Sequence, residues 1–281
     1  MRPGGRLIVA ATMQRHPVLS YLILACAISW VAVLPLILHS NVPSAWHAFG
    51  AIGPIGAALI MNAILGGRGA LREFAGRMVR WRVGKVAWFL ALSPIMLCAV
   101  AIAALAAIGT PLNGATALRA AFADRDWLGA MFLASLAYGV GEEPGWRGFA
   151  LPRLMQDRTA FRATVLLSLG WGIWHVPYFF YRYHLGSIGE YLGFYLGLFA
   201  GALWLTFLYN STGGSTLIVM VWHTVWNAVA LVGAVISPQV VAVTSALIML
   251  SAVIALAVGG ATRLSWTVRR RVPVPQAATS S

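Results

Sequence analysis

The stretch from residue 127 to residue 154 reads WLGAMFLASLAYGVGEEPGWRGFALPRL, an apolar run that ends in two adjacent glutamates. The rest of the chain is similarly apolar, because 60% of its 281 residues are hydrophobic, only 10% are charged, and the mean hydropathy is +0.79. These values are typical of integral membrane proteins and exclude an ordinary soluble domain. Since lipid offers no hydrogen bonds to a backbone, the sequence predicts an all-α, polytopic bundle of membrane helices.

Eight apolar segments are long enough to cross a bilayer core of about 30 Å, which needs roughly 20 helical residues. They cover approximately residues 17–38, 46–66, 86–109, 127–144, 163–181, 188–209, 215–236 and 239–261. No repeat of fixed period and no interdomain linker is apparent. We therefore expect residues 1–281 to form a single integral membrane domain, with a short basic cytoplasmic tail at 262–281.

The basic residues predict the topology, because Lys and Arg accumulate in cytoplasmic loops. With the amino terminus inside, only Arg119, Arg125 and Arg182 of the 20 Lys and Arg residues fall outside. This asymmetry predicts about eight crossings with both termini in the cytoplasm. The net charge of +13 then reflects contact with anionic headgroups of the lipid bilayer and requires no nucleic-acid partner. For the basic loop at 66–85, we expect a solvated surface helix, with recognition of a partner as the alternative.

Glu142 and Glu143 are the one pair of acidic residues that ends a membrane segment. Acidic groups at membrane depth are costly and usually face the bundle interior or a water-filled cavity. Arg147 follows Glu143 by four residues, so the two could form an ion pair along a helix. Pro144 cannot donate to the carbonyl of Val140, and we expect a kink or a helix restart there. The pair is either a structural ion pair at a helix end or part of a functional site.

Two other membrane segments carry polar residues. His175 lies in the stretch WGIWHVPYFF, while His223 and Asn227 lie in VMVWHTVWNAVALVG and share one helical face because they are four residues apart. A single buried His or Asn is usually a packing residue. Three helices could nevertheless bring these side chains and the glutamates into one cavity.

Such a cavity would suit attack on an amide by water. Glu142 is the expected base and proton carrier, and His175 would share or orient the same water. His223 and Asn227 would donate hydrogen bonds to the tetrahedral oxyanion. Glu143 and Arg147 would lie outside the cavity and stabilise the positions of the residues that line it.

In this order, the residues resemble the motifs of the CPBP family of intramembrane proteases, which includes the type II CAAX prenyl endopeptidases and the bacteriocin-processing, or Abi, proteins. The matches are EExxxR at Glu142, Glu143 and Arg147, the histidine of the second motif at His175, and HxxxN at His223 and Asn227. They imply a family-like catalytic core at about 127–236. The second motif is often written FxxxH, whereas Trp171 occupies the aromatic position here. Because Trp keeps the aromatic wall and adds an N–H donor, we expect cavity shape to change more than chemistry.

The resemblance implies an endopeptidase in the cell membrane, with its active site toward the cytoplasm and a membrane-associated or lipid-modified protein or peptide as substrate. We expect no metal or other cofactor, because HExxH spacing and cysteine ligands are absent. If a metal is present, zinc held by Glu142, His175 and His223 is expected. Trp171 and Trp174 would line the path of a substrate, or else be ordinary packing residues or interface anchors.

Two alternative functions remain. A non-enzymatic family member would act as a membrane scaffold or as an immunity or regulatory factor, because a shared fold does not guarantee a shared activity. A proton-coupled transporter would use the same acids and histidines as a proton relay, although no inverted repeat is visible. Retention of all the presumed catalytic residues favours the protease, while nothing in the sequence indicates whether its substrate is prenylated.

Overall fold

The computed structural model describes residues 11–39 and 41–267, and this part of the chain contains helices and no strand. The α-helices are α2 (Pro17–Leu38), α3 (Ile52–Met78), α4 (Lys85–Ala91), α5 (Ser93–Ala107), α6 (Gly114–Ala123), α7 (Arg125–Glu143), α8 (Leu151–Leu154), α9 (Ala160–Trp174), α10 (Ile188–Ser211), α11 (Thr216–Ile236) and α12 (Pro238–Arg263). Two segments, η1 (Ser44–Ala51) and η3 (Val176–Phe180), are 3-10 helices, and η2 (Pro144–Ala150) is a π-helix. The predicted all-α membrane bundle is confirmed, while most of the predicted basic tail lies outside the described residues.

Five helical segments are long and apolar enough to cross a membrane, namely α2, η1 together with α3, α10, α11 and α12. The pair α4 and α5, bent by 50°, adds a sixth if it forms one span. The predicted segments at 127–144 and 163–181 correspond to α7 and α9. Helix α7 carries charged residues at both ends, and α9 has only 15 residues. The count of eight crossings and the side on which the termini lie therefore stay predictions.

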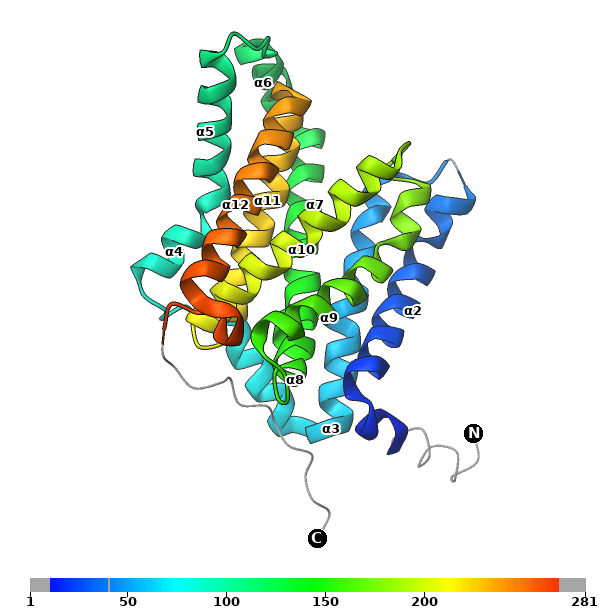
Figure 1. Ribbon diagram of the computed structural model, residues 1–281. Coiled ribbons are helices and arrows are strands. Elements are labelled where there is room, and N and C mark those ends of the chain that lie inside the picture. Colours follow the sequence, from blue (N-terminus) through cyan, green and yellow to red (C-terminus); the bar gives the residue numbers. More distant parts are fainter. Residues whose placement is uncertain (1–10, 40, 268–281) are drawn as a thin grey trace.

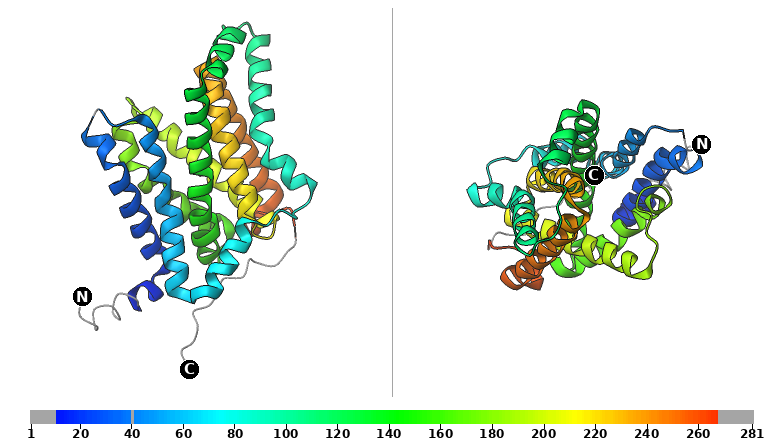
Figure 2. Two further views of the ribbon diagram at one scale, coloured as in Figure 1. Left: turned by 180° about the vertical axis from the view of Figure 1, so that it is seen from behind. Right: turned by 90° about the horizontal axis from the view of Figure 1, so that it is seen from above.

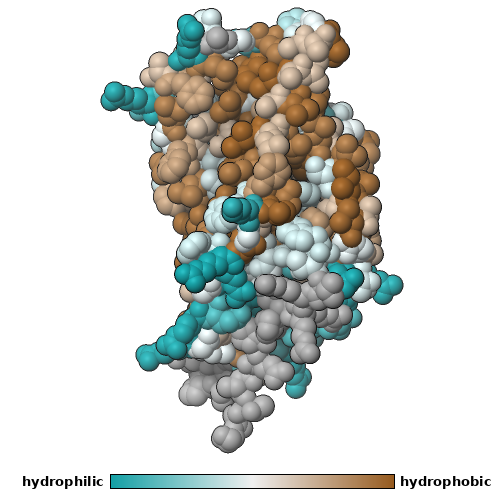
Figure 3. All heavy atoms as spheres, turned by 90° about the vertical axis from the view of Figure 1, so that its left-hand side faces the viewer, coloured by the Kyte–Doolittle hydropathy of each residue, from teal (hydrophilic) through white to brown (hydrophobic). Residues whose placement is uncertain are grey.

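The helices form two groups that α9 and α10 connect. Helices α2 and α3 pack against each other on one side, and α5, α7, α11 and α12 run together on the other (Figures 1 and 2). The most extensive contact between two helices joins α7 to α11. Apolar side chains cover most of one face, between hydrophilic groups at its two ends (Figure 3). This distribution matches a surface that faces lipid.

The basic stretch at 66–85 begins with a bend in α3. Gly67 has φ 55° and ψ −142°, a conformation that glycine adopts readily, and the helix then crosses the lower end of the bundle (Figure 1). Arg77 on this part is 1% exposed. It pairs with Glu73 at 3.2 Å and donates to the Tyr209 hydroxyl of α10 at 3.1 Å. The predicted surface helix therefore exists, but a buried guanidinium attaches it to the bundle, so it is not solvated throughout.

Glycines let α7 approach its neighbours closely. A Cβ at Gly139 would overlap the Thr224 side chain on α11, and one at Gly141 would overlap the Ala51 carbonyl on η1. Small residues allow membrane helices to bring their backbones together in this way. The close packing fixes the end of α7, where Glu142 lies.

The variant Gly139→Ala tests this packing. We expect it to unfold at a lower temperature, because overpacking of a tight contact costs about 1–3 kcal/mol. Gly129→Ala is the matched control, since it lies on the same helix and a Cβ there meets nothing within 4 Å. Thermal unfolding in detergent measures both variants, and equal melting temperatures would show that α7 and α11 are not closely packed.

Candidate active site

A cavity of about 480 Å³ lies among α7, α9, α10, α11 and α12. Its wall includes Glu142, His175, His223 and Asn227, the four residues predicted to be catalytic. Trp171, predicted to line the path of a substrate, is also part of this wall. The structure thus brings these residues together, and their catalytic roles stay predictions.

Glu142 is the glutamate of the pair that faces the cavity. Its Oε2 accepts hydrogen bonds from Nε1 of Trp171 at 2.6 Å and from Nε1 of Trp146 at 3.2 Å. The other oxygen, Oε1, has no hydrogen-bond partner within residues 11–39 and 41–267, yet it is not among the fully enclosed atoms that lack a partner. Oε1 is therefore the oxygen that a molecule in the cavity can reach.

The bond from Trp171 differs from our expectation for this position. We expected Trp in place of Phe to change cavity shape more than chemistry. Its N–H instead donates directly to the candidate base. The substitution therefore adds a hydrogen bond that phenylalanine cannot make.

Glu143 lies behind the cavity wall and binds two partners. Its Oε1 accepts from Arg147 Nη1 at 2.9 Å and lies 2.7 Å from Nδ1 of His223. Glu143 and Arg147 are both 0% exposed. An ionised carboxylate can only accept hydrogen bonds, so Nδ1 of His223 donates to it. This bond fixes the orientation of the ring and leaves Nε2 for the cavity.

The π-helix η2 carries the partners of both glutamates. Pro144 lacks the N–H that an α-helix would use, and a kink or restart was expected there. Helix α7 ends at Glu143 and a wider π-helical turn begins at Pro144, which is a restart, and all seven residues of this turn are buried. Trp146 and Arg147 of this turn bond to Glu142 and Glu143, each four residues earlier.

His175 follows the last residue of α9. Its Nδ1 lies 2.8 Å from the Trp171 carbonyl oxygen, which can only accept, so Nδ1 carries the hydrogen. In the neutral ring, Nε2 is then an acceptor. The residue is 7% exposed and packs edge-on against Trp174, with ring centroids 4.8 Å apart. An imidazole held in this tautomer can take a hydrogen bond from water.

Asn227 lies one turn beyond His223 on α11. It is partly exposed and lines the cavity. Its side-chain amide makes no hydrogen bond with the part of the chain that the structure describes. The amide hydrogens are therefore available to a bound molecule.

Trp174 lies away from the path that was predicted for a substrate. It is 0% exposed, and it is not part of the cavity wall. Its Nε1 donates to Ser29 Oγ on α2 at 2.7 Å. The residue therefore packs in the core, which is the alternative that the sequence left open.

Other residues of the wall escaped the sequence analysis. His47 on η1 lines the cavity, stacks on Tyr138 at 4.7 Å between ring centroids, and binds the Tyr181 hydroxyl at 2.7 Å. Tyr183 lies nearby in the wall, where burial raises its pKa to about 12 and keeps the hydroxyl neutral. In the sequence, the position of His47 inside the apolar segment 46–66 was the one feature that could have indicated its place in the cavity wall.

A zinc ion would need Glu142, His175 and His223 as ligands. Within the described residues, no group of three His, Cys, Asp or Glu side chains is arranged to hold a metal. The donor set of the described residues therefore does not fit a metal in this arrangement.

Glu143→Gln tests the buried ion pair. We expect a loss of about 3–5 kcal/mol of stability, because Arg147 would remain buried without its counter-charge. Arg158→Gln is the control, since its pair with Asp157 is 41% and 67% exposed and such pairs contribute little. Thermal unfolding of purified protein in detergent would measure both. A Glu143→Gln variant as stable as the control would contradict the role of this pair.

Comparisons with known proteins cover the same region. The family described as type II CAAX prenyl endopeptidase, Rce1-like, matches residues 124–229. The CAAX prenyl protease 2 of Methanococcus maripaludis is 30% identical over 108 residues, which make up 36% of this chain and 40% of the relative. The match thus spans about two fifths of the length of that relative. Over residues 124–229, which hold all four candidate catalytic residues, this chain is similar to the type II CAAX prenyl endopeptidase, Rce1-like family.

Proposed function

We propose that this chain is an intramembrane endopeptidase that hydrolyses a peptide bond in a membrane-associated protein or peptide. The observation that carries this proposal is that Glu142, His175, His223 and Asn227 line one cavity. The family match and the name of the curated relative support it independently of the geometry. That name also supports a lipid-modified protein as the substrate class.

The reaction begins with a water molecule in the cavity. Glu142 accepts a proton from this water through Oε1, while Nε2 of His175 accepts a second hydrogen bond and orients it. The water oxygen attacks the carbonyl carbon, and the electrons of the C=O bond move to the oxygen. When the C–N bond breaks, Glu142 gives its proton to the leaving amine. Water is thus divided between the new carboxyl and amino ends.

His223 and Asn227 stabilise the oxyanion in this scheme. The Asn227 amide donates directly, since no residue in 11–39 or 41–267 forms a hydrogen bond with it. His223 donates through Nε2 when its ring is doubly protonated, a form that the charge-assisted bond from Nδ1 to Glu143 favours. One well-placed donor contributes roughly 3 kcal/mol to such a reaction.

We also propose that the site lies near the cytoplasmic side of the membrane. Glu142 is the second-last residue of α7, and η2 and α8 follow that helix; the loop after α8 carries Arg158, and Arg162 lies in the first turn of α9. His223 lies in the second turn of α11, and that helix begins where Ser215 donates to the Arg80 carbonyl. Clusters of arginine mark cytoplasmic ends, which supports this orientation.

Glu142→Gln is the first test of the proposed function. We expect it, like His175→Ala, to abolish cleavage while the protein still inserts, because the amide cannot accept the water proton. Mass spectrometry of new peptide termini in membranes from cells making wild type or variant at equal abundance would detect every cut. Asp157→Asn is the matched control, since this acid is exposed and is not part of the cavity wall.

The outcomes of that experiment separate the rival functions. Cuts that need Glu142 would establish proteolysis and show whether lipid-modified tails are the substrates. Identical termini in wild type and Glu142→Gln, together with an unchanged cellular phenotype, would favour the non-enzymatic scaffold.

We propose that the reaction needs no metal or other cofactor. Activity of the purified enzyme is therefore expected to survive prolonged treatment with EDTA and 1,10-phenanthroline, measured on a substrate found by the terminus analysis. Loss of activity that added zinc restores would contradict this proposal. An equal amount of the non-chelating isomer 1,7-phenanthroline controls for effects on the detergent or the fold.

A further inference from the structure

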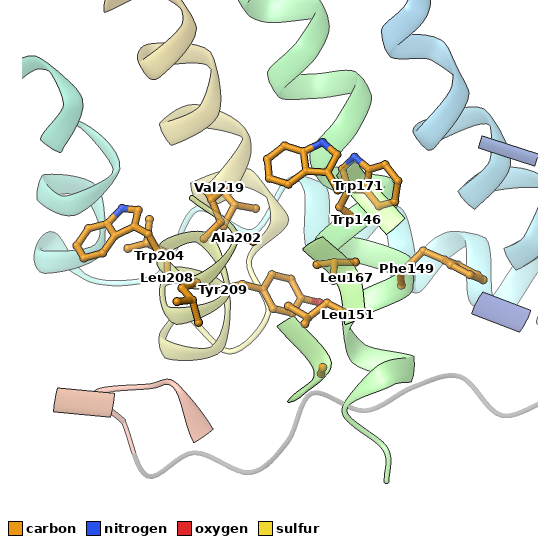
Figure 4. Close-up of a cluster of buried hydrophobic side chains, with 14 of the residues drawn as sticks. Trp146, Phe149, Leu151, Leu167, Trp171, Ala202, Trp204, Leu208, Tyr209 and Val219 are labelled. Carbon is orange, nitrogen blue, oxygen red and sulfur yellow. The ribbon is translucent and has the colours of Figure 1, made fainter. Parts of the chain in front are cut away.

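Two indole rings hold one oxygen of Glu142. Trp146 and Trp171 are 1% and 7% exposed, and both donate from Nε1 to Oε2 of Glu142. Their ring centroids are 6.4 Å apart, and the indole nitrogens lie on neighbouring edges of the two rings (Figure 4). One tryptophan comes from η2 and the other from α9, so the carboxylate joins two separate elements.

Trp171 also contacts the rest of the site. Its ring centroid lies 5.7 Å from that of His175 and 5.9 Å from that of His223. The guanidinium carbon of Arg147 lies 4.6 Å above the ring. This single side chain therefore touches residues from all three motifs.

The hydrogen bonds have a mechanical consequence for Glu142. A carboxylate with no fixed partner can rotate and present either oxygen to water. Two donors on Oε2 restrict that rotation and leave Oε1 toward the cavity. Indole N–H is only a donor, so it neither competes as a base nor neutralises the carboxylate with a formal charge.

We propose that Trp171 is a positioning residue for the proposed hydrolysis. Its N–H, together with that of Trp146, holds Oε2 of Glu142 so that Oε1 meets the attacking water. The inference rests on the proposed function, and it assigns to position 171 a role that a phenylalanine cannot fill.

The sharpest test removes the N–H and keeps the ring. Trp171 is replaced, by site-specific incorporation, with 3-benzothienylalanine, whose bicyclic ring has sulfur in place of N–H. We expect kcat to fall roughly ten- to a hundredfold with KM unchanged, because the substrate pocket keeps its shape while the base loses its orientation. Trp171→Phe should show a similar fall in kcat.

The same replacement at Trp88 is the matched control. The Trp88 indole donates to the Trp81 carbonyl, and Trp88 is not part of the cavity wall. Its turnover should equal that of wild type. A benzothienyl variant at position 171 with wild-type kcat would overturn the inference, while Glu142-dependent cleavage by the wild type would still support the proposed function.

A second measurement needs no turnover. In protein labelled with ¹⁵N-tryptophan, the indole signal that disappears in Trp171→Phe belongs to Trp171. A hydrogen bond of 2.6 Å to a carboxylate should place its proton downfield, and Glu142→Gln should move it upfield because an amide oxygen is a weaker acceptor. An unmoved signal would overturn the inference even if no substrate is ever found.

Discussion

The ion pair between Glu143 and Arg147 is the constraint on which the rest of the site depends. Both side chains are completely buried, and removing two charges from water carries a desolvation cost of several kcal/mol for each ion. Their mutual attraction offsets this cost only while the geometry is kept. His223 from α11 is the second partner of Glu143, so the positions of α7, η2 and α11 are coupled through one carboxylate oxygen.

Two adjacent glutamates can serve different purposes because neighbouring residues on a helix point in directions about 100° apart. Glu143 points into the protein and holds Arg147 and His223. Glu142 lies on the cavity wall, where its partners are neutral indoles. The arginine is thereby bound to the structural glutamate, and the candidate base forms no ion pair with any described residue.

The sequence predicted the helices and the convergence of the motifs because both depend on regular spacing. Apolar length locates membrane helices, and residues four apart share a helical face. Sequence patterns did not predict the features that depend on tertiary contacts. The bond from Trp171 to Glu142 joins residues 29 apart, and Arg77 is buried on the part of α3 that follows a bend at Gly67, which no sequence pattern predicted. Trp171 and Trp174 share a motif, yet one lies in the wall and the other in the core, a difference that only packing determines.

Arg147 and Trp171 connect the two glutamates. Arg147 pairs with Glu143 and lies over the ring of Trp171, and Trp171 donates to Glu142. A cation above an aromatic face is attracted by the ring and withdraws electron density from it. Such polarisation strengthens the indole N–H as a donor, as it does in chains of hydrogen bonds at low dielectric. Arg147 and Glu142 therefore contact the same indole, the guanidinium at its face and the carboxylate at its N–H. A phenylalanine at this position would keep the contact with the cation and lose the N–H donor to Glu142.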